Sequence, residues 1–223
     1  MLFYVLMRRW LSIFKKIMTT IFEPRCLVCE KPIAFGELIC DNCKENLYSP
    51  SLSDGAFKVY HYGKYEYPLS NLIKEFKYHS HPKIAQLLGN MLAKFFIDLK
   101  FPELNYTVSY VPSNFSSVHE KGFVPAHLIA KHFSDILGFP LINLFSSKTL
   151  KRQVQLDYKK RNENVKNKIK LIQDPPKNII IIDDVYTTGA SMNEVGNLLI
   201  KKCDVLVGIT VAKAYRYSFN KSL

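Results

Sequence analysis

The order of apolar and polar positions predicts alternating strands and helices over most of the chain. Short runs that are wholly apolar, or that alternate with polar residues, predict strands at residues 57–63, 106–111, 178–182 and 204–212. Longer periodic runs predict helices at residues 69–78, 83–99, 125–137 and 190–202. Strands that alternate with helices are typical of a parallel sheet with right-handed crossovers. We therefore expect an α/β fold in which helices flank a parallel sheet.

The first fifty residues and the polar stretches follow other patterns. Residues 49–55 are rich in serine, with Pro50 and Gly55, and favour a connector. Residues 113–122 are polar and are typical of a loop. The expected organisation is an N-terminal helix at 1–22, a cysteine module at 23–50 and a larger domain at 55–223.

Residues 178–192 carry the strongest functional signal. The isoleucines Ile179–Ile182 run directly into Asp183 and Asp184. An unbroken β-branched run predicts a buried parallel strand, and carboxylates at its end suit sugar hydroxyls or Mg²⁺. The alternative interpretation is a core strand that ends in a solvated acidic turn.

A loop and a helix follow these carboxylates. Thr187, Thr188 and Gly189 are typical of a tight loop, and Ser191 falls in the first turn of the expected helix. Such a loop presents backbone N–H groups and the positive end of the helix dipole to an anion, usually a phosphate. Together with the carboxylates, the segment predicts a site for a sugar that carries a phosphate.

Four of the five cysteines have metal-ligand spacing. Cys26, Cys29, Cys40 and Cys43 form a C-x₂-C-x₁₀-C-x₂-C pattern. Two C-x₂-C knuckles can complete a tetrahedral Cys₄ site, which is a structural zinc site because no coordination position stays open for water. The alternatives are disulfides or a redox C-x-x-C motif. Cys203, on the helix after the loop, is expected to be a buried core thiol.

Residues 1–22 predict an amphipathic basic helix. Apolar residues such as Trp10 and Ile17 recur on one face, basic residues such as Arg8 and Lys15 cluster on another, and the segment contains no acidic residue. This face could pack on the protein or a partner, or attach peripherally to an anionic membrane. Neither a secretory cleavage pattern nor an apolar run of membrane-spanning length is evident. We expect a cytoplasmic location, with contact at the inner face of the membrane as one alternative.

Charge points to polyanionic partners. The chain of 223 residues has a formal net charge of +12. Residues 148–170 hold nine Lys or Arg and two acidic residues, a net charge of +7. This run could be a solvated face or a track for nucleic acid. Tyr60, Tyr62 and Tyr158 could stack on bases or belong to the core.

The segment DDVYTTGAS resembles the motif with which type I phosphoribosyltransferases bind 5-phosphoribosyl-1-pyrophosphate (PRPP). By this resemblance Asp183 and Asp184 hold the ribose 2′- and 3′-hydroxyls and are the candidates for any catalytic role. The loop that would wrap the 5′-phosphate comprises Tyr186, Thr187, Thr188, Gly189, Ala190 and Ser191. Mg²⁺ would accompany PRPP.

Nearly the whole chain from Cys26 onward is similar to the ComF family of competence proteins, which join a four-cysteine zinc finger to a type I phosphoribosyltransferase-like domain. Further family motifs match at Tyr65, Leu69, Ile73, Lys74 and Lys77, at Val111 and Pro112, and at Gln155, Arg161, Asn164 and Val165. Where the family has RGFNQ, this chain has KGFVP at residues 121–125. Lysine keeps the charge of the arginine but loses its bidentate fork.

The resemblance implies natural transformation, in which incoming single-stranded DNA is taken up and handled, with competence-machinery proteins as partners. The site would bind PRPP or a nucleotide-like ligand. Candidates for a basic pocket or a DNA contact are Lys77, Lys121, Lys151, Arg152, Gln155, Lys160 and Arg161. The alternatives are an active phosphoribosyltransferase that uses Mg²⁺-PRPP in nucleotide metabolism, and an adaptor that docks through its zinc module.

Overall fold

The computed structural model describes residues 23–79, 82–113, 122–147 and 169–215. The predicted helix at 1–22, Lys121 and most of the basic run, including Lys151, Arg152, Gln155, Tyr158, Lys160 and Arg161, lie outside these residues. Within the described part of the chain, none of the helices combines the length and the hydropathy needed to span a bilayer.

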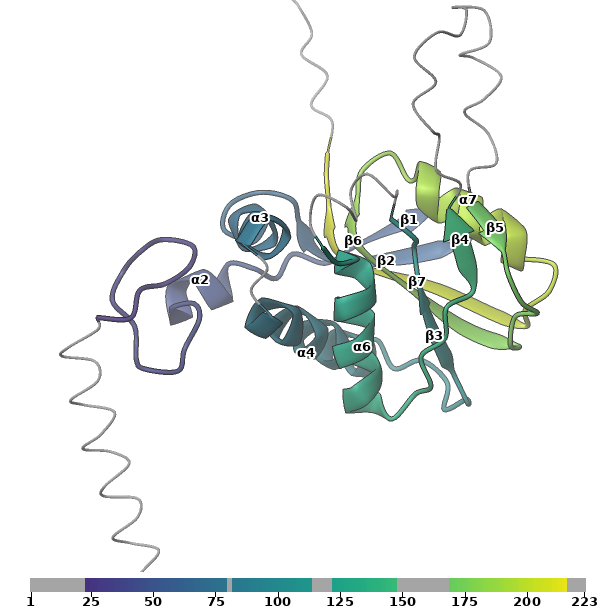
Figure 1. Ribbon diagram of the computed structural model, residues 1–223, viewed down its shortest axis with the longest axis horizontal. Coiled ribbons are helices and arrows are strands. Elements are labelled where there is room, and N and C mark those ends of the chain that lie inside the picture. Colours follow the sequence, from purple (N-terminus) through teal and green to yellow (C-terminus); the bar gives the residue numbers. More distant parts are fainter. Residues whose placement is uncertain (1–22, 80–81, 114–121, 148–168, 216–223) are drawn as a thin grey trace, which may run out of the picture.

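A five-stranded sheet forms the centre of the protein (Figure 1). Its strand order is β1-β2-β7-β6-β3. The strands are β1 (Ser51–Asp54), β2 (Lys58–Lys64), β3 (Thr107–Tyr110), β6 (Asn178–Tyr186) and β7 (Val205–Lys213). Strands β2, β7, β6 and β3 are parallel, whereas β1 pairs with β2 in the antiparallel sense. The predicted parallel sheet is confirmed, with an antiparallel strand added at its edge.

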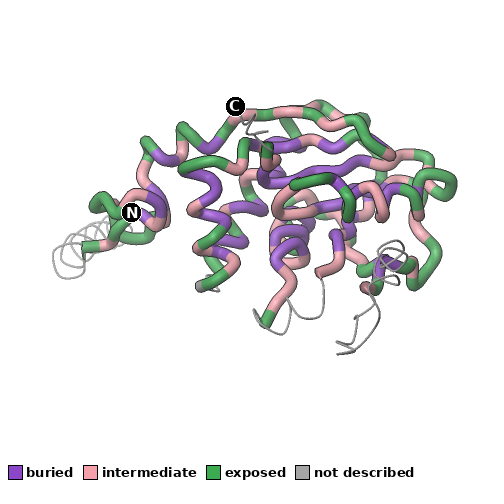
Figure 2. The backbone as a smooth tube through the Cα atoms, turned by 90° about the horizontal axis from the view of Figure 1, so that it is seen from above, coloured by how far each residue is buried: buried purple, intermediate pink, exposed green. Residues whose placement is uncertain are grey.

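Layers on both faces bury the isoleucines of β6. Ile180 and Ile182 share one core cluster with helices α3 (Leu69–His79), α4 (Pro82–Asp98) and α6 (Pro125–Leu137). Ile179 and Ile181 belong to a second cluster, which includes residues of α7 (Ala190–Leu199), β4 (Phe145–Ser147) and β5 (Ile169–Leu171). Figure 2 shows buried positions along the middle of the strands. Burial on both faces explains why β6 is wholly apolar rather than alternating.

The predicted elements agree with the structure within one residue at most boundaries. Four differences stand out. The serine-rich connector contains strand β1, the helix expected at 190–202 ends at Leu199, and the strand expected at 178–182 continues to Tyr186. The short strands β4 and β5 were not predicted; they pair with each other in a separate two-stranded sheet. The serines of β1 adopt strand geometry because β2 supplies the hydrogen-bonding partner, which outweighs their weak strand propensity.

The cysteine module shares its core with the larger domain. Residues 26–47 contribute Cys26, Val28, Ile39, Cys43 and Leu47 to the same buried cluster as the apolar face of α3. The one helix described in the module is α2 (Asp41–Glu45). The module therefore packs against the body of the protein instead of hanging from a linker (Figure 1).

Tyr60 and Tyr62 of β2 belong to the core. The Tyr60 ring lies 5.2 Å from that of Phe101, and the Tyr62 ring lies 5.8 Å from that of Phe95, both edge-on. Both tyrosines are partly buried against the main cluster. Of the two interpretations of these tyrosines, the structure supports core packing over base stacking.

Candidate functional site

The predicted carboxylates lie at the carboxyl edge of the sheet. Strand β6 carries Asp183 and Asp184 near its end, and its register with β7 pairs Asp183 with Thr210. In open α/β sheets ligands bind outside the carboxyl ends of the strands. The chain thus folds its acidic pair to the edge where a ligand site is expected.

Lys77 of α3 joins this acidic pair. Its Nζ atom lies 2.7 Å from Oδ2 of Asp184, and the two side chains are 21% and 14% exposed. The backbone N–H of Asp184 donates to Oδ1 of Asp183 at 2.8 Å, and the N–H of Val185 donates to Oδ1 of Asp184 at 2.6 Å. These bonds fix the orientation of both carboxylates. Of the predicted basic residues, Lys77 is brought to the site.

The surroundings of Asp183 disfavour its charged form. Burial and the negative charge of Asp184 raise the pKa of Asp183 well above its usual value, while the Asp184 N–H and the Lys77 ammonium oppose that rise. A cation bound between the carboxylates would relieve the same repulsion. The pair therefore favours a bound metal ion or a hydroxyl-rich ligand over a second negative charge.

The loop after β6 has a conformation that requires glycine. Gly189 adopts a left-handed conformation, with φ of 76°, and is the N-cap residue of α7. A Cβ atom there would also collide with the ring of Tyr186. Thr187 and Thr188 are exposed before Gly189, and Ala190 and Ser191 are exposed after it. The predicted order of strand, loop and helix is present, with the start of α7 facing solvent.

The described part of the KGFVP segment packs near Lys77. Gly122 has a φ of 74°, and the ring of Phe123 lies 5.3 Å from that of Phe76, the residue before Lys77. Pro125 then occupies the first turn of α6. Phe123 thus packs against α3, the helix that carries Lys77.

A buried histidine behind the loop was missed by the sequence analysis. His61 of β2 is fully buried, and its ring lies 4.8 Å from that of Tyr186. The Thr210 hydroxyl donates to the Ala212 carbonyl, so it accepts from Nδ1 of His61 at 2.7 Å. Nε2 of His61 then accepts from the hydroxyl of Ser53 at 2.9 Å. The alternation of β2 indicates that His61 points inward, but its partners Ser53 and Thr210 lie on two other strands, and Thr210 is 149 positions away in the sequence.

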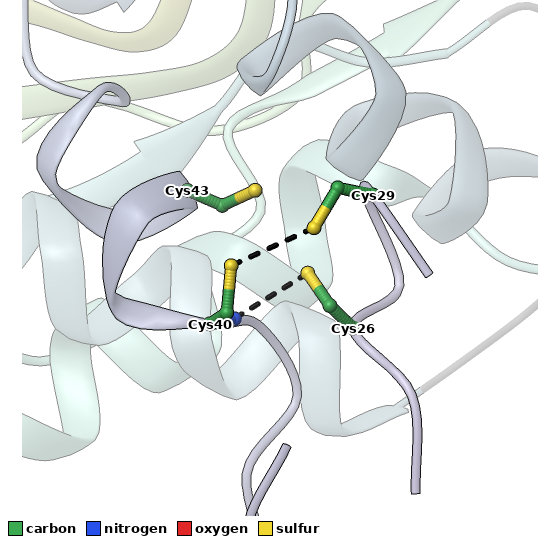
Figure 3. A group of neighbouring side chains, drawn as sticks. All are labelled: Cys26, Cys29, Cys40 and Cys43. Carbon is green, nitrogen blue, oxygen red and sulfur yellow. Dashed lines mark hydrogen bonds between the residues drawn. The ribbon is translucent and has the colours of Figure 1, made fainter. Parts of the chain in front are cut away.

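The four predicted cysteines come together as a candidate metal centre (Figure 3). Their sulfur atoms all lie within 4.8 Å of one another. The Cys29 and Cys40 sulfurs are 3.6 Å apart, close to the separation of about 3.8 Å in a tetrahedral site with Zn–S bonds of about 2.3 Å. A disulfide requires about 2.05 Å, and the cysteines are free. The residues present fit a structural zinc ion.

Local hydrogen bonds prepare one cysteine for ionisation. Burial opposes the thiolate of Cys26, but backbone N–H groups, including that of Cys40 at 3.4 Å from Sγ, outweigh it and lower its pKa to about 6. Burial and the neighbouring sulfurs raise the pKa of Cys43 above its ordinary value. One thiolate is thus available to a cation near neutral pH, and a bound metal would ionise the others.

Cys203 takes no part in this centre. It packs against the second core cluster, which includes residues of α7, and burial raises the pKa of its thiol. It lies beyond the end of α7 at Leu199 and is only partly buried, so the prediction of a buried thiol on that helix is wrong in both placement and burial.

The buried histidine makes stability depend on pH. Burial and the charge of Lys213 lower the pKa of His61 from 6.5 to about 4. Its stabilising contribution is therefore complete above pH 6.5 and is lost as the pH falls toward 4. Over this interval we expect His61 to account for a loss of up to roughly 3 kcal/mol in the free energy of unfolding.

Urea denaturation between pH 7 and pH 4 measures this dependence. In His61→Gln the amide replaces both ring hydrogen bonds without titrating, so its free energy of unfolding should fall less steeply with pH. Equal slopes for the two proteins would contradict the assignment of a neutral, buried His61.

The relatives of the chain carry competence names. Comparison with protein-family models gives no match. The chain is 30% identical over 190 residues to competence protein F of Haemophilus influenzae, covering 80% of this chain and 79% of that protein. It is 24% identical over 183 residues to competence protein ComFC of Bacillus subtilis, covering 79% and 72%. It is 25% identical over 197 residues to DNA utilization protein YhgH of Salmonella typhimurium, covering 79% and 84%.

Solved phosphoribosyltransferases are more distant. Adenine phosphoribosyltransferase of Leishmania tarentolae aligns with a TM-score of 0.44 and 13% identity, over 73% of this chain and 94% of that one. The glutamine PRPP amidotransferase of Bacillus subtilis aligns with a TM-score of 0.40 and 18% identity, over 61% and 30%. Because competence protein F reaches 30% identity across most of both chains, the present protein belongs to the ComF family of competence proteins.

Proposed function

We propose that this protein acts in DNA uptake and that the carboxyl edge of its sheet binds a phosphoribosyl ligand such as PRPP. The observation that carries the proposal is the convergence of Asp183, Asp184 and Lys77 beside the loop at Gly189. Membership in a family of competence proteins supports the biological role. The edge position of the site supports a ligand that is small, polar and charged.

Each part of the site suits a part of that ligand. Carboxylates at the end of β6 can accept hydrogen bonds from the ribose hydroxyls or hold Mg²⁺. The loop from Tyr186 to Ser191 leads into the exposed start of α7, where backbone N–H groups and the helix dipole favour the 5′-phosphate. The left-handed Gly189 gives the backbone the turn that this approach needs.

Lys77 suits the remaining charge of the ligand. It now neutralises Asp184, yet at 21% exposure its ammonium stays accessible at the edge of the sheet. Pyrophosphate or a phosphate attached to the anomeric carbon would offer a stronger partner for this cation. Mg²⁺ bound with PRPP would then neutralise the carboxylates in place of the Lys77 ammonium.

A working phosphoribosyltransferase is the second candidate function. The specific observation that favours it is again Lys77, because pyrophosphate departure develops negative charge that a cation at this place would stabilise. Release of pyrophosphate in the presence of a panel of nucleobases distinguishes transfer from binding. Binding without release would leave the site as a sensor or an anchor.

Single-stranded DNA is the proposed macromolecular partner. The net charge of +12 and the basic run at 148–170 supply the electrostatic attraction. We also propose competence-machinery proteins as partners. Residues 1–22 would contact the inner face of the cytoplasmic membrane, and the protein would then act in the cytoplasm.

Calorimetry with Mg²⁺-PRPP tests the site. We expect Asp183→Asn and Asp184→Asn each to weaken binding about tenfold or more, because each removes a charged acceptor of the ligand. Asp204→Asn is the matched control, since Asp204 is exposed and pairs with Lys177 on the surface. Unchanged affinity in both site variants, or an equal loss in the control, would refute the assignment.

Fluorescence anisotropy with a labelled oligonucleotide tests the partner. We expect binding at about 50 mM salt that weakens steeply toward 200 mM as counterions are released. Replacing Lys151, Arg152, Lys160 and Arg161 with alanine should reduce the salt slope by up to about 3, at roughly 0.7 per phosphate contact. Lys177→Ala should leave the slope close to that of the natural protein. Absence of binding at low salt would exclude the DNA partner.

A further inference from the structure

Helix α3 joins the cysteine module to the acidic site. We propose that the metal-loaded cysteine module positions Lys77, through α3, against Asp183 and Asp184, so that metal occupancy sets the affinity of the site for its ligand. This inference rests on the proposed function where it concerns the ligand. The structural coupling between the module and Lys77 does not depend on the proposed function. Figure 1 shows α3 between α2 of the module and the edge of the sheet at β6.

The N-terminal end of α3 contacts the cysteine module. Leu47 of the module and Leu69, the first residue of α3, are both buried in the same core cluster. The Leu47 carbonyl oxygen and a methyl group of Leu69 both occupy the space where a Cβ atom on Gly63 would lie. The module and the start of α3 therefore meet in direct contact.

Buried side chains extend this contact along the helix. Leu69, Leu72, Ile73 and Phe76 of α3 are at most 1% exposed, and they share one cluster with the buried residues of the module. Close packing transmits small displacements because the interior offers no room for independent adjustment. A shift of the module would therefore move α3 as a body.

The far end of α3 carries the functional charge. Lys77 follows Leu69 by eight residues, or about 12 Å of helix at 1.5 Å per residue. Its Nζ atom lies 2.7 Å from Asp184, and an ion pair at this distance weakens quickly with separation. Loss of this contact would leave Asp183 and Asp184 to repel each other without the opposing cation.

A bound metal ion would add to the contacts that already hold the module together. Its two knuckles are held together by contacts that include the Leu27 N–H to Leu38 carbonyl bond of 2.9 Å and the Cys29–Cys40 sulfur contact of 3.6 Å. A zinc ion would add four strong bonds across the same gap. Removing it should loosen both knuckles and, with them, the packing of the module against the start of α3.

Hydrogen exchange of the full chain, without ligand, tests the coupling alone. Comparing the zinc-loaded protein with protein treated with a chelator, we expect faster exchange in residues 69–79 and unchanged protection in residues 179–182 of β6. An unchanged α3 after zinc removal would overturn the proposal, and so would equal loss of protection in α3 and β6.

A thermodynamic cycle with Mg²⁺-PRPP tests the functional consequence. Zinc removal should weaken binding to the natural protein at least about fivefold, within the usual range of coupling between sites. In Lys77→Ala, binding should be weaker at the outset and zinc removal should cause little further loss, because the cation that the module positions is gone. Lys74→Ala, on an exposed position one turn earlier, should keep the full response to zinc.

Two outcomes of the cycle would contradict the proposal. Equal zinc effects in the natural protein and in Lys77→Ala would mean that the module acts on the site by another route. No zinc effect in the natural protein would mean that it does not act on the site. If PRPP fails to bind any of the proteins, the proposed ligand is wrong, and the exchange experiment still decides whether the module holds α3.

Discussion

Two adjacent carboxylates at the end of a buried strand are the constraint on which the rest of this structure depends. Asp183 and Asp184 follow four buried isoleucines, so their charges stand at the boundary between a dry core and solvent. Lys77 neutralises one of them, and two backbone N–H groups orient both. Burial and mutual repulsion still raise the pKa of Asp183. Such a pair is costly for the fold and is suited to a ligand that brings hydroxyls or a cation.

The surrounding elements support this pair from both faces of the sheet. Tyr186 packs between His61 behind the loop and the glycine that turns the chain into α7. Helix α3 brings Lys77 from the opposite face of the sheet and shares a buried core cluster with Cys26 and Cys43. The cysteine module is thereby a neighbour of the site's supporting helix, although the two are far apart in the sequence.

Much of this could be predicted from the sequence because the signals are local. The isoleucine run, the C-x₂-C pairs and the Thr-Thr-Gly turn depend on neighbouring residues, and each has one common structural solution. Strand β1 could not be predicted, since its serines favour strand only when β2 offers its edge. The Lys77–Asp184 pair, across 107 positions, and the partners of His61 depend on tertiary packing. Helical periodicity placed Lys77 on α3 but could not indicate which carboxylate it meets.

The most direct test of the account is a crystal structure of the zinc-loaded protein with Mg²⁺-PRPP. The account predicts the ribose hydroxyls or Mg²⁺ at Asp183 and Asp184 and the 5′-phosphate at the loop from Thr187 to Ser191. It also predicts that the Lys77 ammonium leaves its position 2.7 Å from Asp184 to contact the ligand. A ligand bound elsewhere, with the Lys77–Asp184 pair intact, would contradict it.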